Sequence, residues 1–494
     1  MPSEMLPVII QGGMGVGISS WMLAQAVSSR GQLGVVSGTA LDVSLVRHLN
    51  NGDPDGHYRR AMAAFPVQEY VAEALERFFR PEGRGGEPYT PLKMFTMTLD
   101  RERARLLALA NFVEVYLARE GHSGPVGINF LTKIQFPNLP SLYGAMLAGV
   151  NYVLMGAGIP RDIPGALDRM ARHEPASMHI DVAGADGSPD EMLHFDPRSI
   201  WDGEPVEVTR PAFLPIIASN SLATMMAKKA SGRIDGFIVE GPTAGGHNAP
   251  PRGPKQLNER GEPIYGERDV VDLHKLGELG LPFWVAGGAG SPERLEEARA
   301  QGAAGIQVGT LFAYADESGL RSDLKARVIQ LALEGKVDVF TDDRASPTGF
   351  PFKVVTLGDS MSEAAVYERR KRVCDMGYLR TPYRREDGRI RFRCASEPVD
   401  TYLKKGGALE DTVGRKCLCN SLLANLGLGQ VREGEAGEEL PLLTSGDDLV
   451  NLGRFLQGRT SYTAADVMDY LLATPAGAAA APLAPAAEAS RPLP

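Results

Sequence analysis

The sequence predicts an α/β protein whose first two-thirds folds as a (β/α)8 barrel. Short β-branched runs alternate with helical patterns, which is typical of a parallel sheet, and about eight such units follow one another. Glycine or polar residues also follow at least five of the predicted strands, so they would share one face of a barrel. A doubly wound open sheet is the alternative, because periodicity alone does not separate the two arrangements.

Each predicted element rests on its local pattern. Short apolar runs that end at glycine or polar residues predict strands over residues 8–11, 33–37, 126–130, 152–155, 214–218, 234–239, 283–286 and 305–308. Helical spacing of apolar residues predicts helices over residues 21–29, 142–148, 222–230 and 292–301.

Two segments interrupt this alternation. Residues from about 41 to 122 are helical in pattern and charged, and they predict an insertion within a barrel of residues 1–340. Residues 345–470 carry all the cysteines and no βα rhythm, and they predict a C-terminal extension or cap. Residues 474–494 are rich in alanine and proline and are expected to be disordered.

Composition excludes several classes of protein. The 494 residues are enough for one large domain and a smaller unit, and the formal net charge of −9 argues against a nucleic-acid partner. No apolar run reaches the ~18 residues that a membrane span needs. The first eight residues lack the pattern of a signal peptide, so a cytoplasmic location and no membrane partner are expected.

The most informative motif follows the run Ile234 to Val239. Its loop has glycines at 241, 245 and 246 and then presents His247. Glycine lets backbone approach a ligand closely, and histidine titrates nearest neutral pH. We interpret this as a catalytic loop at the carboxyl end of a barrel strand; a flexible turn with an incidental histidine is the alternative.

Other glycine clusters follow other strands. Gln11 to Gly15 comes after the first strand, where bare backbone would lie against a flat ring system or form a simple tight turn. Ala286 to Pro292 and Gln307 to Thr310 follow the last two strands, where barrels commonly bind phosphate. Free amides at the helix start near Pro292 would form an anion site, unless the two segments are unrelated turns.

Two further strand ends carry polar residues. Asn129 ends one strand, and Lys133 follows it. The amide could form a hydrogen bond with a ring edge, and the nearby cation could lie by the anionic N1 region of a reduced flavin. Ser219 and Asn220 stand in the same position after another strand. A solvated strand–loop junction explains either pair by itself. Together, the motifs predict a phosphorylated, planar cofactor beneath His247, and neither the dinucleotide fingerprint nor a P-loop is present.

The same motifs resemble a known family. QGGMG at 11, GINF at 127, EGPTAGGH at 240, AGGAG at 286 and GIQVGTLFAYADES at 305 are similar to the nitronate monooxygenase family, formerly 2-nitropropane dioxygenases. That family includes FMN-dependent enoyl-acyl carrier protein reductases. The resemblance covers roughly residues 6 to 320.

The resemblance implies a TIM barrel that binds FMN non-covalently, with His247 as the active-site histidine. The contact at Glu240 is less secure, because many members of the family have glutamine there. The resemblance implies FMN contacts at Gly13, Met14, Asn129, Glu240, Gly245, Gly246, Gly287, Gly288, Gln307, Gly309 and Thr310. The QGGM opening is closer to the enoyl reductases than to many nitronate oxidisers. The resemblance therefore leaves the substrate open.

The extension raises two further questions. Cys374, Cys394, Cys417 and Cys419 could ligate zinc or an iron–sulfur cluster, but the usual paired spacing is absent, and buried reduced cysteines are the simpler interpretation, so no metal is predicted. The arginine-rich stretch from Glu368 to Cys394 would suit an acyl carrier protein or the phosphates of coenzyme A. A solvated face paired with local acids explains it more simply.

Three hypotheses of function follow. The first is an FMN-dependent nitronate monooxygenase that oxidises alkyl nitronates with O2 to carbonyl compounds and nitrite. The second is an FMN-dependent enoyl-acyl carrier protein or enoyl-CoA reductase of fatty acid or polyketide synthesis, with NAD(P)H as reductant. The third is a non-catalytic binding subunit on a barrel fold, against which the retained histidine and glycine loops argue.

Overall fold

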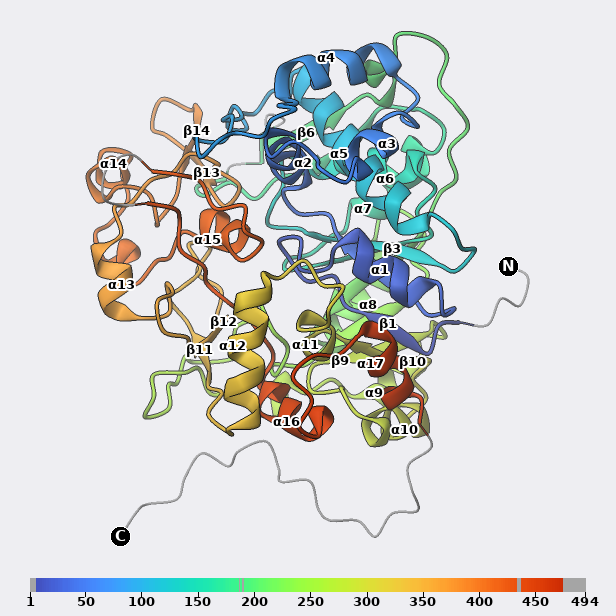
Figure 1. The fold of residues 1–494 in the computed structure, drawn as a ribbon, viewed down its shortest axis with the longest axis vertical. Helices are drawn as coiled ribbons and strands as arrows, with labels where there is room; N and C mark the ends of the chain where they lie inside the picture. The colour runs from blue at the N-terminus through green and yellow to red at the C-terminus, as the bar shows by residue number, and fades with distance from the viewer. Residues whose placement is uncertain (1–5, 186, 189–190, 433–436, 474–494) are drawn as a thin grey trace.

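The structure is a computed structural model that describes residues 6–185, 187–188, 191–432 and 437–473. The predicted disordered tail at 474–494 lies outside these residues. Figure 1 shows one helix-rich body in which the barrel, the N-terminal insertion and the C-terminal extension lie against one another.

Eight parallel strands form the predicted barrel. Their order is β1-β10-β9-β8-β7-β4-β3-β2, and a parallel bridge from Ile10 to Leu33 joins β1 to the start of β2 and closes the ring. This confirms the (β/α)8 barrel and excludes the open sheet. The strands are β1 (Ile9–Gln11), β2 (Gly34–Ser37), β3 (Val126–Leu131), β4 (Tyr152–Gly156), β7 (Ala212–Ile217), β8 (Phe237–Glu240), β9 (Phe283–Ala286) and β10 (Gly305–Val308).

The barrel interior is a dry cluster of strand side chains. Ile10, Val35, Leu154, Leu214 and Trp284 are inaccessible to solvent and belong to one such cluster. The indole Nε1 of Trp284 donates to the carbonyl of Pro7, 2.7 Å away, so its polar atom is satisfied. Because this packing fills the barrel, a ligand site is left only at its rim.

Helices surround the strands. N-cap side chains start several of them: Ser20 accepts from the Leu23 amide, and Asp100 accepts from the Arg103 amide. The helices that follow barrel strands are α1 (Trp21–Ser28), α5 (Arg101–Arg119), α6 (Asn138–Leu147), α7 (Ile163–Met170), α8 (Asn220–Lys229), α9 (Leu273–Gly277), α10 (Pro292–Ala300), α11 (Thr310–Ala313) and α12 (Ser322–Leu333).

The predicted insertion at about 41–122 is helical. It holds α2 (Leu41–Asn50), α3 (His57–Met62), α4 (Gln68–Phe78) and then α5, which packs against α1 and α6 as a barrel helix. A second excursion between β4 and β7 has no sequence prediction. It is an antiparallel hairpin of β5 (Ala176–His179) and β6 (Met192–Phe195), followed by the short 3-10 helix η2 (Pro197–Ile200).

The C-terminal segment leaves the barrel and then returns to it (Figure 1). Among its described residues, the first part holds two antiparallel hairpins, three short α-helices and one 3-10 helix: β11 (Val339–Asp342), β12 (Phe352–Val355), α13 (Ala364–Arg369), β13 (Thr381–Arg384), β14 (Ile390–Arg393), α14 (Val399–Lys404), η4 (Glu410–Thr412) and α15 (Leu418–Ala424). We call residues 345–430 the cap. Then η6 (Asp447–Asn451), α16 (Leu452–Leu456) and α17 (Ala464–Leu471) follow, and α17 packs against α1, α10 and α11.

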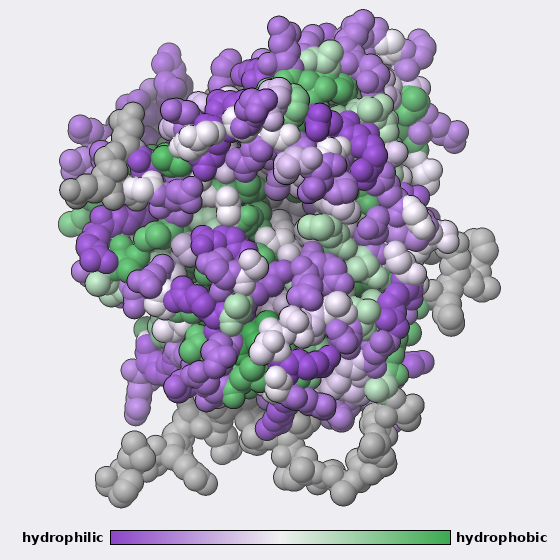
Figure 2. Space-filling view, viewed as in Figure 1, coloured by the Kyte–Doolittle hydropathy of each residue, from purple (hydrophilic) through white to green (hydrophobic). Residues whose placement is uncertain are grey.

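The surface is ordinary for a folded chain. In Figure 2 the visible face is mostly hydrophilic, with apolar side chains in separate small groups. Within the described ranges, no helix is both long and apolar enough to cross a bilayer.

Candidate active site

A single large pocket lies at the carboxyl ends of the barrel strands, beneath the cap. It holds about 1550 Å³ of empty space, including its opening to solvent. Every residue predicted for the site lines it: Gly13, Met14, Asn129, Glu240, Gly245, Gly246, His247, Gly287, Gly288, Gln307, Gly309 and Thr310. The structure therefore brings together loops that follow β1, β3, β8, β9 and β10. The roles of these residues remain predictions.

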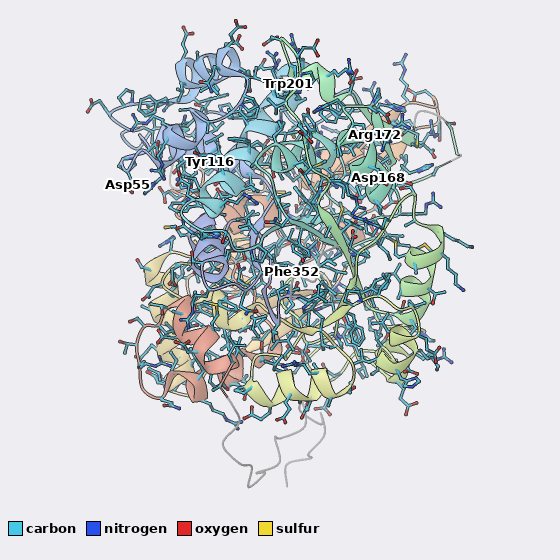
Figure 3. The ribbon with its side chains drawn as sticks, turned by 90° about the vertical axis from the view of Figure 1, so that its right-hand side faces the viewer. Asp55, Tyr116, Asp168, Arg172, Trp201 and Phe352 are labelled. Carbon is cyan, nitrogen blue, oxygen red and sulfur yellow. The ribbon has the colours of Figure 1, made fainter. Side chains whose placement is uncertain are left out.

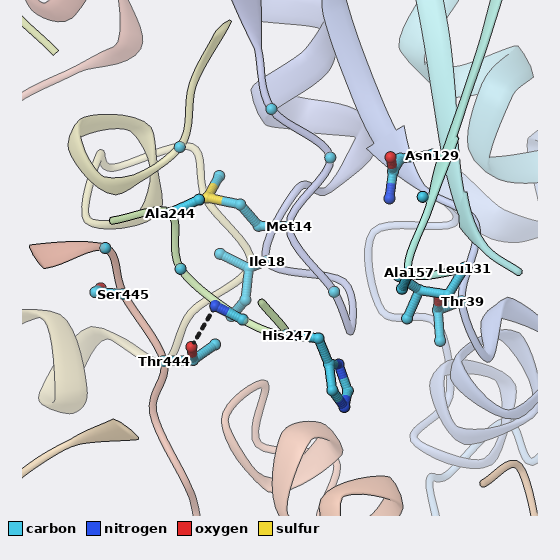
Figure 4. Close-up of a pocket in the computed structure, with 18 of the residues that line it drawn as sticks. Met14, Ile18, Thr39, Asn129, Leu131, Ala157, Ala244, His247, Thr444 and Ser445 are labelled. Atoms are coloured by element: carbon cyan, nitrogen blue, oxygen red, sulfur yellow. Dashed lines mark hydrogen bonds between the residues drawn. The ribbon is translucent and has the colours of Figure 1, made fainter. Parts of the chain in front are cut away.

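His247 projects into this pocket from the loop after β8 (Figure 4). Its Nε2 lies 2.7 Å from the hydroxyl of Ser346, and its ring packs edge-on against Phe352, with centroids 4.9 Å apart. Phe352 lies deep inside the molecule (Figure 3). Both partners come from the C-terminal segment, so the orientation of the histidine depends on residues about 100 positions later.

The loop that carries His247 is held by the C-terminal segment through its backbone. The amide of Gly246 donates to Thr444 Oγ1 at 2.8 Å (Figure 4), and the carbonyl of Gly246 accepts from the Lys353 amide at 2.9 Å. The amide of Asp447 donates to the Thr243 carbonyl at 2.9 Å. These bonds hold an otherwise glycine-rich loop in one position, as a preorganised site needs.

Three titratable groups influence one another here. Burial, with a smaller contribution from the positive charge of Lys133, lowers the pKa of His247 to about 3. Burial lowers the pKa of Lys133 to about 6, although the negative charge of Glu240 opposes this change. Burial likewise raises the pKa of Glu240 to about 7, although the positive charge of Lys133 opposes that change. At neutral pH His247 is therefore a neutral imidazole, which binds a ligand through hydrogen bonds rather than charge.

Lys133 does not line the pocket, in contrast to the predicted position near a flavin. Its Nζ lies 2.7 Å from the centroid of the Phe350 ring and has no hydrogen-bond partner among the residues that the structure describes. In its charged form it lowers the pKa of Glu240 and of His247 from behind the wall.

Glycine is required at several wall positions for different reasons. A Cβ on Gly13 would lie 2.1 Å from Asn129 Cβ, and a Cβ on Gly245 would lie 2.8 Å from the carbonyl carbon of Ser445. Gly246 and Gly287 have φ values of +78° and +89°, which side chains rarely adopt. These glycines let three chain segments meet at the pocket wall.

The wall also fits a planar, polar-edged ligand. The Oε1 atom of Gln307 is buried and has no hydrogen-bond partner among the described residues, although the side chain lines the pocket. A native protein rarely leaves such an acceptor unpaired, so a donor from a ligand is expected there. A Cβ added to Gly246 would meet no protein atom within 4 Å, so the space above that backbone is open. The ring system of FMN fits this combination.

The predicted phosphate end is different. Gly288, Gly309 and Thr310 meet there as expected, but the hydroxyl of Thr310 donates to Oδ1 of Asp448 at 2.6 Å. The predicted free amides at the start of α10 are not all free, because Ser291 Oγ accepts from the Arg294 amide at 3.3 Å. A carboxyl group from η6 thus occupies part of the position expected for an anion.

Ser219 and Asn220 do not contribute to the pocket. Ser219 caps α8 by accepting from the Leu222 amide at 3.0 Å, and Asn220 Nδ2 donates to the carbonyl of Asp272 at 2.8 Å. At this strand end, the two residues form part of a strand–loop junction rather than of the site.

The cap contributes a roof that the sequence motifs did not reveal. It consists of apolar side chains with one tyrosine and one thiol: Met376, Tyr378, Leu379, Leu418, Cys419 and Leu422. Tyr378 anchors the roof, because its hydroxyl donates to Asp42 on α2, which also pairs with Arg103 on α5. Only the helical spacing of Leu418 and Leu422 hinted at such a face.

The four cysteines are free thiols in the cap. Cys374 and Cys394 share a hydrogen bond, which lowers the pKa of Cys394 to about 7. Over the part of the chain that the structure describes, no group of three or more histidine, cysteine or acidic side chains is placed to hold a metal ion.

The predicted arginine stretch is partly internal. Arg370 pairs with Glu439 and Arg384 with Glu191, both at 2.7 Å, and both acids are distant in the sequence and largely buried rather than part of a solvated local face. The side chains of Arg385, Arg389 and Arg391 are exposed on and beside the β13–β14 hairpin. Docking of an acyl carrier protein remains a prediction.

Part of the chain matches a known family model. Residues 207–342, which span β7 to β11, match the family model described as nitronate monooxygenase. The resemblance expected from the sequence is confirmed. The nitronate monooxygenase segment supplies three of the pocket's five strand ends, including the loop with His247. No curated protein sequence matches the chain.

Solved structures of similar fold include three enzymes. FabK from Thermotoga maritima is 15% identical, with 95% of this chain and 92% of that chain covered and a TM-score of 0.47. Nitroalkane oxidase from Streptomyces ansochromogenes is 15% identical, with 95% and 96% covered and a TM-score of 0.45. The enoyl reductase domain of MlnA from Bacillus amyloliquefaciens is 12% identical, with 94% and 95% covered and a TM-score of 0.48. Similarity this low carries no argument about function.

Proposed function

We propose that this protein is an FMN-dependent oxidoreductase of the nitronate monooxygenase type, which oxidises alkyl nitronates with O2 to carbonyl compounds and nitrite. One observation carries the proposal: His247, Asn129 and the glycine loops of four other strand ends line one pocket under an apolar roof. The match of residues 207–342 to the nitronate monooxygenase model supports it.

The wall residues would hold FMN by backbone contact. Gly13, Gly246 and Gly287 would admit the ring system, and Gln307 Oε1 would accept a hydrogen bond from its edge. When bound, FMN would supply the redox chemistry between the nitronate and oxygen. The roof would exclude bulk water from this reaction.

His247 would orient the substrate. Since its imidazole is neutral, one ring nitrogen donates and the other accepts, and Ser346 restrains Nε2. A bound nitronate anion would raise the pKa of this imidazole and strengthen its hydrogen bond to the substrate oxygen. With a neutral nitroalkane, the same group would act as the base.

One observation favours a second candidate, the FMN-dependent enoyl-acyl carrier protein or enoyl-CoA reductase. The roof is more apolar than a small nitronate requires, because Met376, Leu379, Leu418 and Leu422 all face the pocket. Such a surface suits an acyl chain. NAD(P)H would then be the reductant.

An anaerobic absorbance titration of the purified protein decides between the two. Flavin bands that are bleached by an alkyl nitronate, but not by NADH or NADPH, support the monooxygenase. Rapid bleaching by a nicotinamide alone supports the enoyl reductase. A colourless protein that takes up no FMN contradicts both.

A further inference from the structure

Asp448 is a carboxyl group in an unexpected place. It lines the pocket between the loops after β9 and β10, where the sequence predicts a phosphate. Within the described chain, no cation pairs with it, whereas its neighbour Asp447 is paired with Lys353 at 2.6 Å. The carboxyl of Asp448 instead accepts the hydroxyl hydrogen of Thr310 at 2.6 Å.

The surrounding backbone leaves this carboxyl little freedom. A Cβ on Gly446 would lie 2.7 Å from Asp448 Oδ1, and a Cβ on Gly290 would lie 3.3 Å from Oδ2. Glycines on both sides therefore make room for the carboxyl, in the same way that glycines make room for a ligand. Thr310 Oγ1 also accepts from the Gly446 amide at 3.1 Å, which fixes the direction of its hydroxyl hydrogen toward Asp448.

We propose that Asp448 determines how strongly the pocket prefers a phosphorylated flavin, because its carboxyl lies at the predicted phosphate end and repels a phosphate there when it is ionised. The inference rests on the proposed function, in that the pocket takes a flavin. An ionised Asp448 would repel a phosphate at this end, and a protonated one would donate a hydrogen bond to it. The preference for FMN over riboflavin would then fall as Asp448 loses its proton.

The charged environment favours the protonated form. Burial raises the pKa of Asp448, the hydrogen bond from Thr310 opposes the rise, and the negative charge of Asp447 adds to it. The other titratable groups that face it are Tyr314, which follows α11 and hydrogen-bonds to Ser445, and Lys353 on β12, which is bound to Asp447. None of these brings a free positive charge to the carboxyl.

The experiment compares FMN with riboflavin, which lacks the phosphate. Dissociation constants for both are measured by flavin fluorescence on the flavin-free full-length protein, at pH 5.5 and pH 8, for wild type and Asp448→Asn. The amide has the shape of the carboxyl and still accepts from Thr310. Glu293→Gln is the matched control, because Glu293 lies in the first turn of α10 at the same end but is exposed.

At pH 8, Asp448→Asn is expected to bind FMN about tenfold more tightly than wild type, with riboflavin unchanged to within about twofold. At pH 5.5 the gain in FMN affinity should shrink to about threefold or less, because a larger share of the wild-type carboxyl is protonated at the lower pH. Glu293→Gln should behave as wild type, because its charge is screened by solvent.

Two results would overturn the inference. One is an unchanged ratio of FMN to riboflavin affinity in Asp448→Asn at pH 8. The other is equal weakening of both ligands, which would make Asp448 a structural support for α11. Asp448→Ser repeats the test if the asparagine variant does not fold, as judged by thermal melting. A wild-type protein that binds neither flavin would instead contradict the proposed function.

Discussion

Replacement of Gly13 by alanine tests whether the glycine after β1 sets the shape of the pocket. The new Cβ would lie 2.1 Å from Asn129 Cβ, 2.9 Å from Asn129 Cγ and 3.1 Å from Val35 Cγ1. Carbon atoms pack at ~3.5 Å or more, so the two chains must separate by about 1.4 Å. Since Asn129 Cβ is fixed by the backbone of β3, no change of rotamer relieves the contact.

The size of the effect follows from this geometry. Overpacking of this kind costs about 1–3 kcal/mol of the free energy of unfolding. If the loop relieves the strain by moving into the pocket, a flavin must reverse that movement, and the same energy weakens binding by about 5- to 150-fold. We therefore expect Gly13→Ala to be purified with much less flavin than wild type.

The adjacent residue provides the control. A Cβ on Gly12 would meet its nearest atom, Gln307 Cγ, at 3.5 Å, which is an ordinary contact, although Gly12 also lines the pocket. The assay is the ratio of flavin to protein absorbance, together with the melting temperature of each variant. Equal flavin content in Gly13→Ala and Gly12→Ala would refute the reasoning.

Three further predictions follow from the site and its supports. His247→Ala should lower turnover by about 10²- to 10⁴-fold while the flavin content stays at the wild-type level; loss of the flavin would assign the histidine to cofactor binding instead. Burial raises the pKa of Glu114 to about 7, although a hydrogen bond from the Trp21 amide opposes the rise. The protonated side chain therefore contributes stability that is fully present below pH 4.5 and is lost as the pH rises through 7. Between pH 4.5 and pH 8 the free energy of unfolding of the wild type should fall by up to about 3 kcal/mol because of this group, and Glu114→Gln should not show that part of the fall. Urea denaturation measures it, and a pH profile like that of the wild type would contradict the prediction. Leu418→Ala, at a roof residue only 1% exposed, should lower the free energy of unfolding by about 2–5 kcal/mol, and a loss below about 1 kcal/mol would show that the roof does not pack as described.

The strands of the barrel were predictable because their signals are local, whereas the choice of a barrel over an open sheet rested on the family resemblance. Each strand is a short apolar run that ends at a glycine or a polar residue, as at Val239 before the loop of His247. Parallel strands in a barrel place all their carboxyl ends on one face, so motifs far apart in the chain could be assigned to one site without knowing any contact. Every predicted site residue lines the pocket for this reason.

The contributions of the C-terminal segment were not predictable, because they depend on long-range packing. Ser346 and Phe352 show no motif, yet they set the environment of His247. Asp448 lies in a short polar stretch that resembles a surface turn, yet its carboxyl reaches the predicted phosphate end. The return of α17 to the barrel helices was likewise hidden within a stretch that we assigned to a C-terminal extension or cap.

The sequence by itself therefore predicted the strands and helices of the barrel and the residues of the pocket wall, because hydrophobic period and glycine position act over a few residues. The tertiary structure alone decided how the pocket is roofed, why His247 is neutral and what faces the phosphate end. Those properties arise from burial and charge contributed by segments a hundred or more residues away, and burial is a property of the folded chain rather than of any local pattern.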